Sequence, residues 1–164
     1  MKIAITDANI FIDLIYIELQ HELFVADLEI HTTFDVYDEL NANQQEILSL
    51  YLDQKLLSLH VNDIDRVPAS ILQNKRLSPS DKSVFGLALA LDAFILTGDG
   101  VLWKASNIQK IEVHGILWLL DRFIAMNLLS ENIAATCLQN LMKYNKRLPS
   151  KDCNERLVKW CQVK

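Results

Sequence analysis

Four acidic side chains stand where the sequence predicts that strands end or helices begin, and together they could bind a divalent cation. Asp7 and Asp99 each follow a short apolar run that is typical of a buried strand. Glu39 lies in a short helix predicted after the second strand, and Asp81 opens the helix that precedes the fourth. Clustered carboxylates need a positive counter-charge, and ligand sets made only of oxygen favour Mg²⁺ or Mn²⁺.

Each of these acids also has an ordinary structural role open to it. Asp7 could cap the helix that follows it, and Glu39 could be a solvated helix residue. Asp81 stands three residues after Ser78, the spacing of a capping box, and Asp99 stands in a glycine-flanked turn. Capping does not exclude metal binding, so both interpretations stay open for all four residues.

The elements that must position these acids alternate between strands and helices. Such an alternation predicts an α/β fold, a three-layer domain with a mostly parallel sheet of four to five strands covered by helices. Ligands bind at the carboxyl ends of the strands in sheets of this kind, which is where the acids are expected. We expect strands at 2–6, 29–33, 56–61, 93–97 and 111–113, and helices at 9–20, 36–40, 43–55, 63–73, 79–91, 101–106, 116–127, 131–144 and 151–162. Pro68 weakens the helix predicted at 63–73, and Ser130 and Ser150 are expected to be N-caps.

Length and composition indicate one globular domain. The chain has 164 residues, of which 51% are hydrophobic, so residues 1–164 are expected to form a single domain, with a core at 1–114 and a helical extension at 115–164. No apolar run approaches the roughly 18 residues needed to span a bilayer, and residues 1–20 lack a basic signal-peptide region. We therefore expect a cytoplasmic protein with no membrane partner. Its three cysteines show no disulfide or zinc-site spacing.

Charge is distributed unevenly along the chain. The net charge is −5, which argues against non-specific attraction of nucleic acid by the whole surface. Residues 143–164, however, contain seven basic and two acidic residues, a local charge of +5. This basic tail could bind a nucleic-acid backbone or a partner, or it could be an ordinary solvated helix surface.

Five segments, taken in order, resemble the PIN-domain nuclease family. The stretch 3–13 is similar to the family's opening strand followed by Asp-x-Asn, and 36–40 is similar to its second block, an acid before leucine. The stretch 78–90 resembles an acid that opens an alanine-rich helix, and 94–102 resembles a strand that ends in Thr-x-Asp. Residues 113–120 and the helices beyond resemble a prokaryotic subgroup that carries an extra helical tail.

This resemblance implies a nuclease that cleaves single-stranded or structured RNA with divalent metal ions. Asp7, Glu39, Asp81 and Asp99 would be the catalytic and metal-binding residues. Many prokaryotic members are toxins of toxin–antitoxin pairs, of the VapC kind, and form homodimers, so an antitoxin partner and a homodimer are implied as well. Gly98 departs from the family pattern, which commonly has Asn or Asp there, and Asp81 follows Pro-Ser rather than a glycine-rich lead-in.

Further residues are expected to assist the acids. Asn9 and Thr97 would orient a carboxylate or a phosphate from outside the metal-binding set. Because an acidic centre cannot attract RNA unaided, basic residues must flank it, and the candidates are Lys82, Lys104, Lys75 and Arg76. The indole of Trp103 could stack on a base, or it could simply pack in the core.

Two other functions compete with the ribonuclease interpretation. The strand that ends at Asp7 and the later Thr-Gly-Asp-Gly superficially resemble a haloacid-dehalogenase-type phosphatase. That chemistry needs a second aspartate as general acid, whereas Asn9 stands at that position and cannot donate a proton in this way. The other alternative is a catalytically silent module that binds nucleic acid or assembles with a partner through its C-terminal helices.

Overall fold

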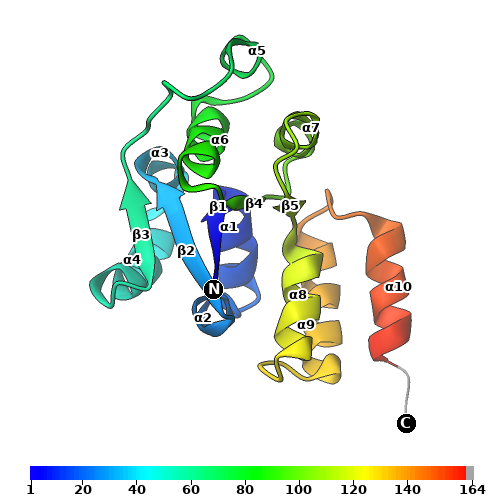
Figure 1. Cartoon of the computed structure of the whole chain (residues 1–164). Coiled ribbons are helices and arrows are strands. Elements are labelled where there is room, and N and C mark those ends of the chain that lie inside the picture. The colour runs from blue at the N-terminus through cyan, green and yellow to red at the C-terminus, as the bar shows by residue number, and fades with distance from the viewer. Residues whose placement is uncertain (162–164) are drawn as a thin grey trace.

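A five-stranded parallel sheet forms the centre of the protein. The computed structural model describes residues 1–161 and orders the strands β3-β2-β1-β4-β5 (Figure 1). The strands are β1 (Lys2–Thr6), β2 (Leu28–Thr33), β3 (Leu57–His60), β4 (Phe94–Leu96) and β5 (Val113–His114). The helices are α1 (Ala8–Tyr16), α2 (Gln20–Val25), α3 (Phe34–Glu39), α4 (Ala42–Asp53), α5 (Ala69–Leu72), α6 (Pro79–Leu91), α7 (Gly100–Ile108), α8 (Ile116–Ala125), α9 (Glu131–Tyr144) and α10 (Ser150–Trp160). The α/β class, the parallel sheet and its strand number are as predicted.

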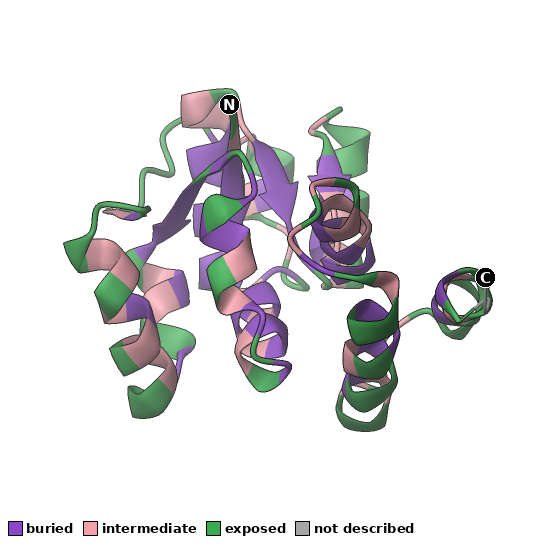
Figure 2. Cartoon of the chain, turned by 90° about the horizontal axis from the view of Figure 1, so that it is seen from below, coloured by how far each residue is buried: buried purple, intermediate pink, exposed green. Residues whose placement is uncertain are grey.

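Helices cover both faces of the sheet. Three successive residues of β1, Ala4 to Thr6, are buried, and so are all residues of β4. Successive side chains of a strand point to opposite faces, so burial of consecutive residues requires protein on both sides. Figure 2 shows the strands as mostly buried between helices whose outer faces are exposed. This is the three-layer arrangement expected from the near-continuous apolar runs of the strands.

The central strand β1 is the switch point of the sheet. The chain adds β2 and β3 on one side of β1 and then β4 and β5 on the other. Strand β1 pairs with β2 on one side and with β4 on the other, with Thr6 beside Leu96. The backbone N–H of Asp7 donates to the carbonyl of Leu96 at 3.0 Å, which extends this pairing by one residue. Sheets of this type bind ligands at such a switch point, beyond the carboxyl ends of the strands. Asp7 and the residues that follow β4 are therefore neighbours at this edge.

Two predicted helices differ from those in the structure. The helix expected at 9–20 ends at Tyr16, and Glu18 adopts a left-handed conformation with φ of 58° before α2, which was not predicted. No glycine or proline marks this break, because a glutamate makes the left-handed turn. The helix expected at 63–73 is reduced to the single turn α5, since Pro68 ends the preceding loop and stands at its N-cap.

Three helices form the C-terminal end of the described chain. In Figure 1, α8, α9 and α10 lie side by side beyond β5, with α10 outermost. Ser130 caps α9 as predicted, and its side chain accepts from the backbone N–H of Ile133. Ser150 is the first residue of α10 rather than its cap, and Pro149 takes the cap position without a side-chain bond. No helix in the described part of the chain is both long and apolar enough to cross a membrane.

The loop before α5 is held close to α6 at a glycine. A Cβ atom at Gly86 would lie 2.5 Å from the carbonyl oxygen of Asp63 and 3.0 Å from Val67 Cγ2. We expect Gly86→Ala to lower the free energy of unfolding by about 1–3 kcal/mol, because the loop backbone must move away. Urea unfolding measures this change. Gly100→Ala is the matched control, since nothing lies within 4 Å of its Cβ position, and an equal loss in both variants would contradict the packing argument.

Candidate functional site

Asp7 is the most deeply buried acid at the carboxyl edge of the sheet. Only 4% of the residue is exposed, and it stands between β1 and α1 as the helix N-cap. Its Oδ1 accepts from the backbone N–H of Ala8 at 2.8 Å. Its Oδ2 accepts from Thr97 Oγ1 at 2.8 Å and from Asn9 Nδ2 at 2.7 Å. The carboxylate is thus fixed in orientation by neighbours on α1 and directly after β4.

The pKa of Asp7 is raised from 3.8 to about 6. The largest cause is burial, which disfavours the ionised form, and the negative charges of Asp81 and Glu39 raise the pKa further. The hydrogen bonds from Thr97 and Ala8 act in the opposite direction. A carboxylate held in this way near neutral pH lacks positive charge beside it, and a bound cation would supply that charge.

Asp99 is joined to Asp7 through Thr97. The Thr97 hydroxyl donates to Asp7 and accepts from the backbone N–H of Asp99 at 3.0 Å. Asp99 caps α7, and its Oδ1 accepts from the N–H groups of Val101 and Leu102 at 2.9 and 2.8 Å. Asp99, considered from the sequence as a turn residue, is in fact a helix cap, and this places it at the same edge of the sheet as Asp7.

Asn9, on α1, is the third residue of a hydrogen-bonded group beside Asp7. We call this group, Asn9, Thr97 and Gly98, the clamp. The amide nitrogen of Asn9 donates to Asp7, and its Oδ1 accepts from the backbone N–H of Gly98 at 2.7 Å. A Cβ atom at Gly98 would lie 3.3 Å from Asn9 Oδ1, so the glycine gives the amide room to approach the backbone. The Asn9 side chain ties together α1 and the turn after β4, as an orienting residue would.

Asp81 and Glu39 lie on the other side of Asp7, where α6 begins and α3 ends. Asp81 forms the predicted capping box: its Oδ2 accepts from the N–H of Ser78 at 2.8 Å, and Ser78 Oγ accepts from the N–H of Asp81 at 3.1 Å. Burial raises the pKa of Asp81, and the charges of Asp99 and Glu39 add to the effect. Ser80, a buried residue that sequence reasoning missed, donates its hydroxyl to Glu39 Oε1 at 2.5 Å.

Several pairs among the four acids repel each other, but the four do not form a closed cluster. Asp81 is electrostatically coupled to both Asp99 and Glu39, and Asp7 to Asp81 and Glu39. Within residues 1–161, however, no three His, Cys, Asp or Glu side chains are grouped closely enough to hold a metal ion. The expectation of four carboxylates within a few ångströms is not met, because each is held by a helix N-terminus or a hydroxyl.

The chemistry of the donor set nevertheless fits a hard divalent cation. All donors are carboxylate oxygens, the ligands that Mg²⁺ and Mn²⁺ prefer. In the described chain, none of these carboxylates is paired with a lysine, arginine or histidine; the ion pairs there join Lys2 and His114 to Glu112, His31 to Glu29 and Arg156 to Asp121. The raised pKa values of Asp7 and Asp81 express the same lack of compensating positive charge.

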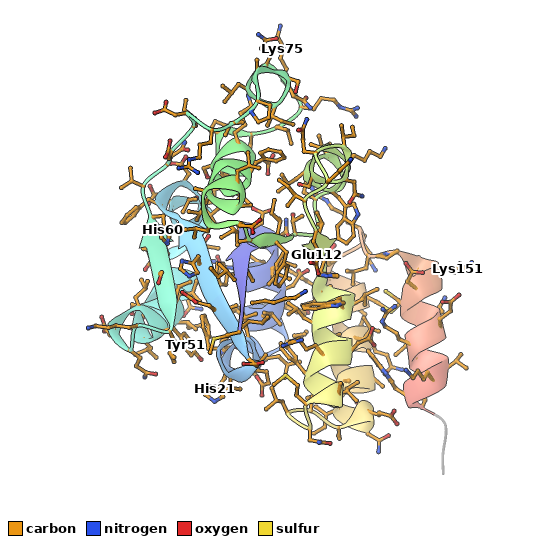
Figure 3. All side chains as sticks on the ribbon, in the orientation of Figure 1. His21, Tyr51, His60, Lys75, Glu112 and Lys151 are labelled. Atoms are coloured by element: carbon orange, nitrogen blue, oxygen red, sulfur yellow. The ribbon has the colours of Figure 1, made fainter. Side chains whose placement is uncertain are left out.

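The basic residues proposed to flank the acids are placed unevenly. Lys82 is half-buried on α6, next to Asp81, and Lys104 is exposed on α7. Lys75 and Arg76 are exposed between α5 and α6, and Figure 3 shows Lys75 at the outer tip of the molecule. Lys82 and Lys104 thus belong to the helices that carry Asp81 and Asp99, whereas Lys75 points away from the sheet.

Asp13 is a second buried acid that sequence reasoning missed. It is 5% exposed on α1, and Asn145 Nδ2 donates to its Oδ2 at 3.0 Å. Burial raises the pKa of Asp13 to about 6, although the bond from Asn145 acts against this. The signal was present in the sequence, since Asp13 is the one charged residue in the mostly apolar segment 8–16.

Comparison with known proteins agrees with this fold. A family model described as "DUF3368: PIN domain" matches residues 3–162 of the chain. This protein belongs to the PIN domain family. PIN domains are generally nucleases that use divalent metal ions, so the match gives the chain a nuclease-type fold. The matched range, residues 3–162, includes the three C-terminal helices α8, α9 and α10.

Two other comparisons add little to the PIN assignment. A solved structure of "a domain of a functionally unknown protein" from Methanocaldococcus jannaschii DSM 2661 is 18% identical, with a TM-score of 0.49. The match covers 71% of this chain and 91% of that one. None of the curated proteins matches the chain.

Proposed function

We propose that this PIN domain is a divalent-metal-dependent endoribonuclease that hydrolyses phosphodiester bonds of single-stranded or structured RNA. The observation that carries the proposal is the set of four carboxylates, Asp7, Glu39, Asp81 and Asp99, near the switch point of the sheet, where Asp7 and Asp81 repel each other and are each repelled by Glu39, and Asp99 repels Asp81. They come from four different elements and lack a cationic partner within the described chain. Acids that served only as helix caps would not have to lie close enough together to repel each other.

Asp7, Asp81 and Asp99 would hold Mg²⁺ or Mn²⁺, and Glu39 would complete the set or share a second ion. When bound, the ion supplies Lewis acidity, which activates water and balances charge on the phosphoryl group. Hydrolysis breaks the bond between phosphorus and the 3′ oxygen, which leaves with a proton as a hydroxyl, and the phosphate stays on the 5′ end. The chain's own residues orient the carboxylates and exclude solvent around Asp7.

Thr97 and Asn9 would act by orienting Asp7, and Lys82, Lys104, Lys75 and Arg76 would bring RNA to the acids. A role as the toxin of a toxin–antitoxin pair, with an antitoxin partner, a homodimer and a cytoplasmic location, rests on the family resemblance. The identity of the gene next to this one would test the toxin role directly, because a toxin requires its antitoxin.

One alternative is weakened by the geometry. In a haloacid-dehalogenase-type phosphatase, a general acid would stand where Asn9 donates its amide to Asp7 and accepts from Gly98. Both polar atoms of Asn9 are occupied in holding the backbone and the carboxylate, and neither releases a proton. The other alternative, a catalytically silent module, is favoured by one observation: the four acids are not grouped as a ready metal site in the described chain.

Cleavage of a mixed single-stranded RNA pool separates these functions. The wild-type protein is incubated with Mg²⁺, with Mn²⁺ or with chelator, and the ends of the products are identified. A ribonuclease of the proposed kind gives 5′-phosphate and 3′-hydroxyl ends, and chelator abolishes the products. A folded protein that binds metal but cleaves no RNA in the pool would support the silent module instead.

Thr97 offers a test of the orienting role. Thr97→Val keeps the shape of the side chain but removes the hydroxyl that donates to Asp7 and accepts from Asp99 N–H. We expect cleavage to fall roughly 10- to 100-fold, the range for residues that orient metal ligands. Thr97→Ser retains the hydroxyl and should keep most of the activity. Equal activity of the valine and serine variants would contradict the orienting role.

A further inference from the structure

A cavity of about 670 Å³ opens beside the acids, and the C-terminal helices form its far wall. Its near wall is the clamp next to Asp7, made of Asn9, Thr97 and Gly98. The opposite wall is the connection between α9 and α10, residues 145–149. Sites for small ligands range from about 300 to 1,000 Å³, so the volume suits a single nucleotide.

The far wall of the cavity carries two cationic side chains. Lys146 and Arg147 are exposed, line the cavity and make no side-chain ion pair within the described residues. Arg156 also lines it, but this side chain is occupied by two hydrogen bonds to Asp121 Oδ2. Lys146 and Arg147 are therefore the cations available to a phosphate.

Aromatic rings from three elements line the same cavity. Trp103 comes from α7, Trp118 from α8 and Tyr144 from the end of α9. Tyr144 is 50% exposed although it stacks on Tyr16 at 4.0 Å between ring centroids. Any of the four bases can stack on an accessible aromatic ring. Because Tyr144 is already held by Tyr16, its ring loses little conformational freedom when a base stacks on it.

A buried hydrogen-bond acceptor, Asp13 on α1, also lines the cavity. Asn145 occupies only its Oδ2, so Oδ1 has no hydrogen-bond donor within the described chain. Asn145 Oδ1 in turn accepts from the backbone N–H of Arg147 at 3.0 Å. Asp13 thus holds the loop that carries the cations, and it keeps one acceptor atom for a ligand's N–H or O–H group.

We propose that this cavity binds one unpaired nucleotide of a single-stranded RNA, with its phosphate at Lys146 and Arg147 and its base among Trp103, Trp118 and Tyr144. The inference rests on the proposed ribonuclease function, because the strand bound in the cavity would be the substrate that is cleaved at the neighbouring acids. The basic residues of the tail, rather than those on α6 and α7 alone, then offset the repulsion between RNA and the acidic centre. A strand that leaves the cavity past Asn9 and Gly98 arrives directly at Asp7.

Fluorescence anisotropy of a labelled 12-nucleotide RNA in chelator tests the cavity without cleavage. We expect Arg147→Glu to weaken binding about tenfold or more and to reduce the slope of log affinity against log salt by about one. Lys151→Glu is the matched control, since this exposed lysine lies in the first turn of α10 and does not line the cavity (Figure 3). Tyr144→Ala should also weaken binding about tenfold, with unchanged salt dependence.

Several results would overturn the inference. Equal losses in Arg147→Glu and Lys151→Glu would show general attraction by the basic tail, and equal affinity for a duplex of the same sequence would exclude an unpaired nucleotide. The donor to Asp13 is identified by comparing the affinities for RNA and DNA of the same sequence. Weaker binding of DNA indicates a ribose hydroxyl, and equal binding indicates a base N–H. An Asp13→Asn variant that binds both like wild type would remove Asp13 from the site.

The binding measurement, taken together with the cleavage assay, separates this inference from the proposed function. If the wild type cleaves RNA but Arg147→Glu binds RNA like the wild type, the cavity proposal fails and the ribonuclease stands. If the wild type never cleaves, yet Arg147→Glu alone loses affinity, the ribonuclease fails and the nucleotide cavity stands by itself. Thermal unfolding of each variant shows whether a loss of binding comes from a loss of fold.

Discussion

Asp99→Asn is expected to lower metal-dependent RNA cleavage by at least two orders of magnitude. The amide can still cap α7, since its oxygen accepts from the same N–H groups, so the fold is retained. What is lost is the negative charge that a divalent ion needs at the end of β4. Initial rates of cleavage with Mg²⁺ or Mn²⁺ in excess measure the effect, and thermal unfolding confirms that the variant is folded.

The chain offers a close control for this substitution. Asp92→Asn makes the same chemical change in the same region of sequence, but Asp92 is exposed and ends α6 in a left-handed conformation that asparagine tolerates well. Its activity should equal that of the wild type. Near-full, metal-dependent cleavage by Asp99→Asn would show that Asp99 is only a helix cap.

Asp7→Asn is expected to abolish cleavage and, in chelator, to stabilise the fold near neutral pH. In the folded protein the pKa of Asp7 is about 6 against the usual 3.8, so between these values the folded chain binds more protons than the unfolded chain. The free energy of unfolding of the wild type therefore falls as pH rises from about 4 to 6. The shift corresponds to about 3 kcal/mol, and the variant, which cannot ionise, escapes this loss above pH ~6.

Urea unfolding in chelator at pH 4, 5, 6 and 7 measures this difference between the two proteins. Asp13 also has a raised pKa near 6, but it is present in both proteins and its contribution cancels. The difference should grow from near zero at pH ~4 to its full value above pH ~6. A constant difference across this range, or a variant less stable than wild type at pH 7, would contradict the account of Asp7 as an uncompensated buried charge.

The positions of the acids followed from the sequence because local rules decide them. An apolar run that stops at an acid predicts a strand followed by a cap, and Asp7 and Asp99 occupy such positions. Asp81 forms the capping box that its spacing from Ser78 predicts. Parallel strands then bring these caps to one edge of the sheet, so a simple topological rule predicted the neighbourhood of the site.

Features that depend on packing between distant residues were not predictable in this way. The left-handed Glu18 that separates α1 from α2 has no glycine to announce it. The bond from Asn145 to Asp13 joins residues 132 positions apart and depends on how α9 and α10 return to α1. The cavity beside the acids arises from that return, and for this reason the tail's basic residues showed no relation to the site in the sequence.

The hydrogen bonds of the acids explain how the protein folds with its carboxylates apart. Helix N-termini and hydroxyls satisfy Asp7, Asp81 and Asp99 individually, and this permits a stable fold without a cation. In the proposed metal centre, coordination of an ion would replace some of these bonds. Relief of the repulsion among the acids would then offset the loss of those bonds, and we expect metal binding to raise the free energy of unfolding.

Calorimetric titration of Mn²⁺ into the wild type and into Asp7→Asn at pH 7.5 tests the central claim most directly. Four carboxylates that serve as one metal centre predict saturable binding by the wild type, with one or two ions per chain. They also predict binding that is at least tenfold weaker in the variant. Undetectable binding by the folded wild type, or equal binding by the two proteins, would contradict the claim that these acids form a metal centre.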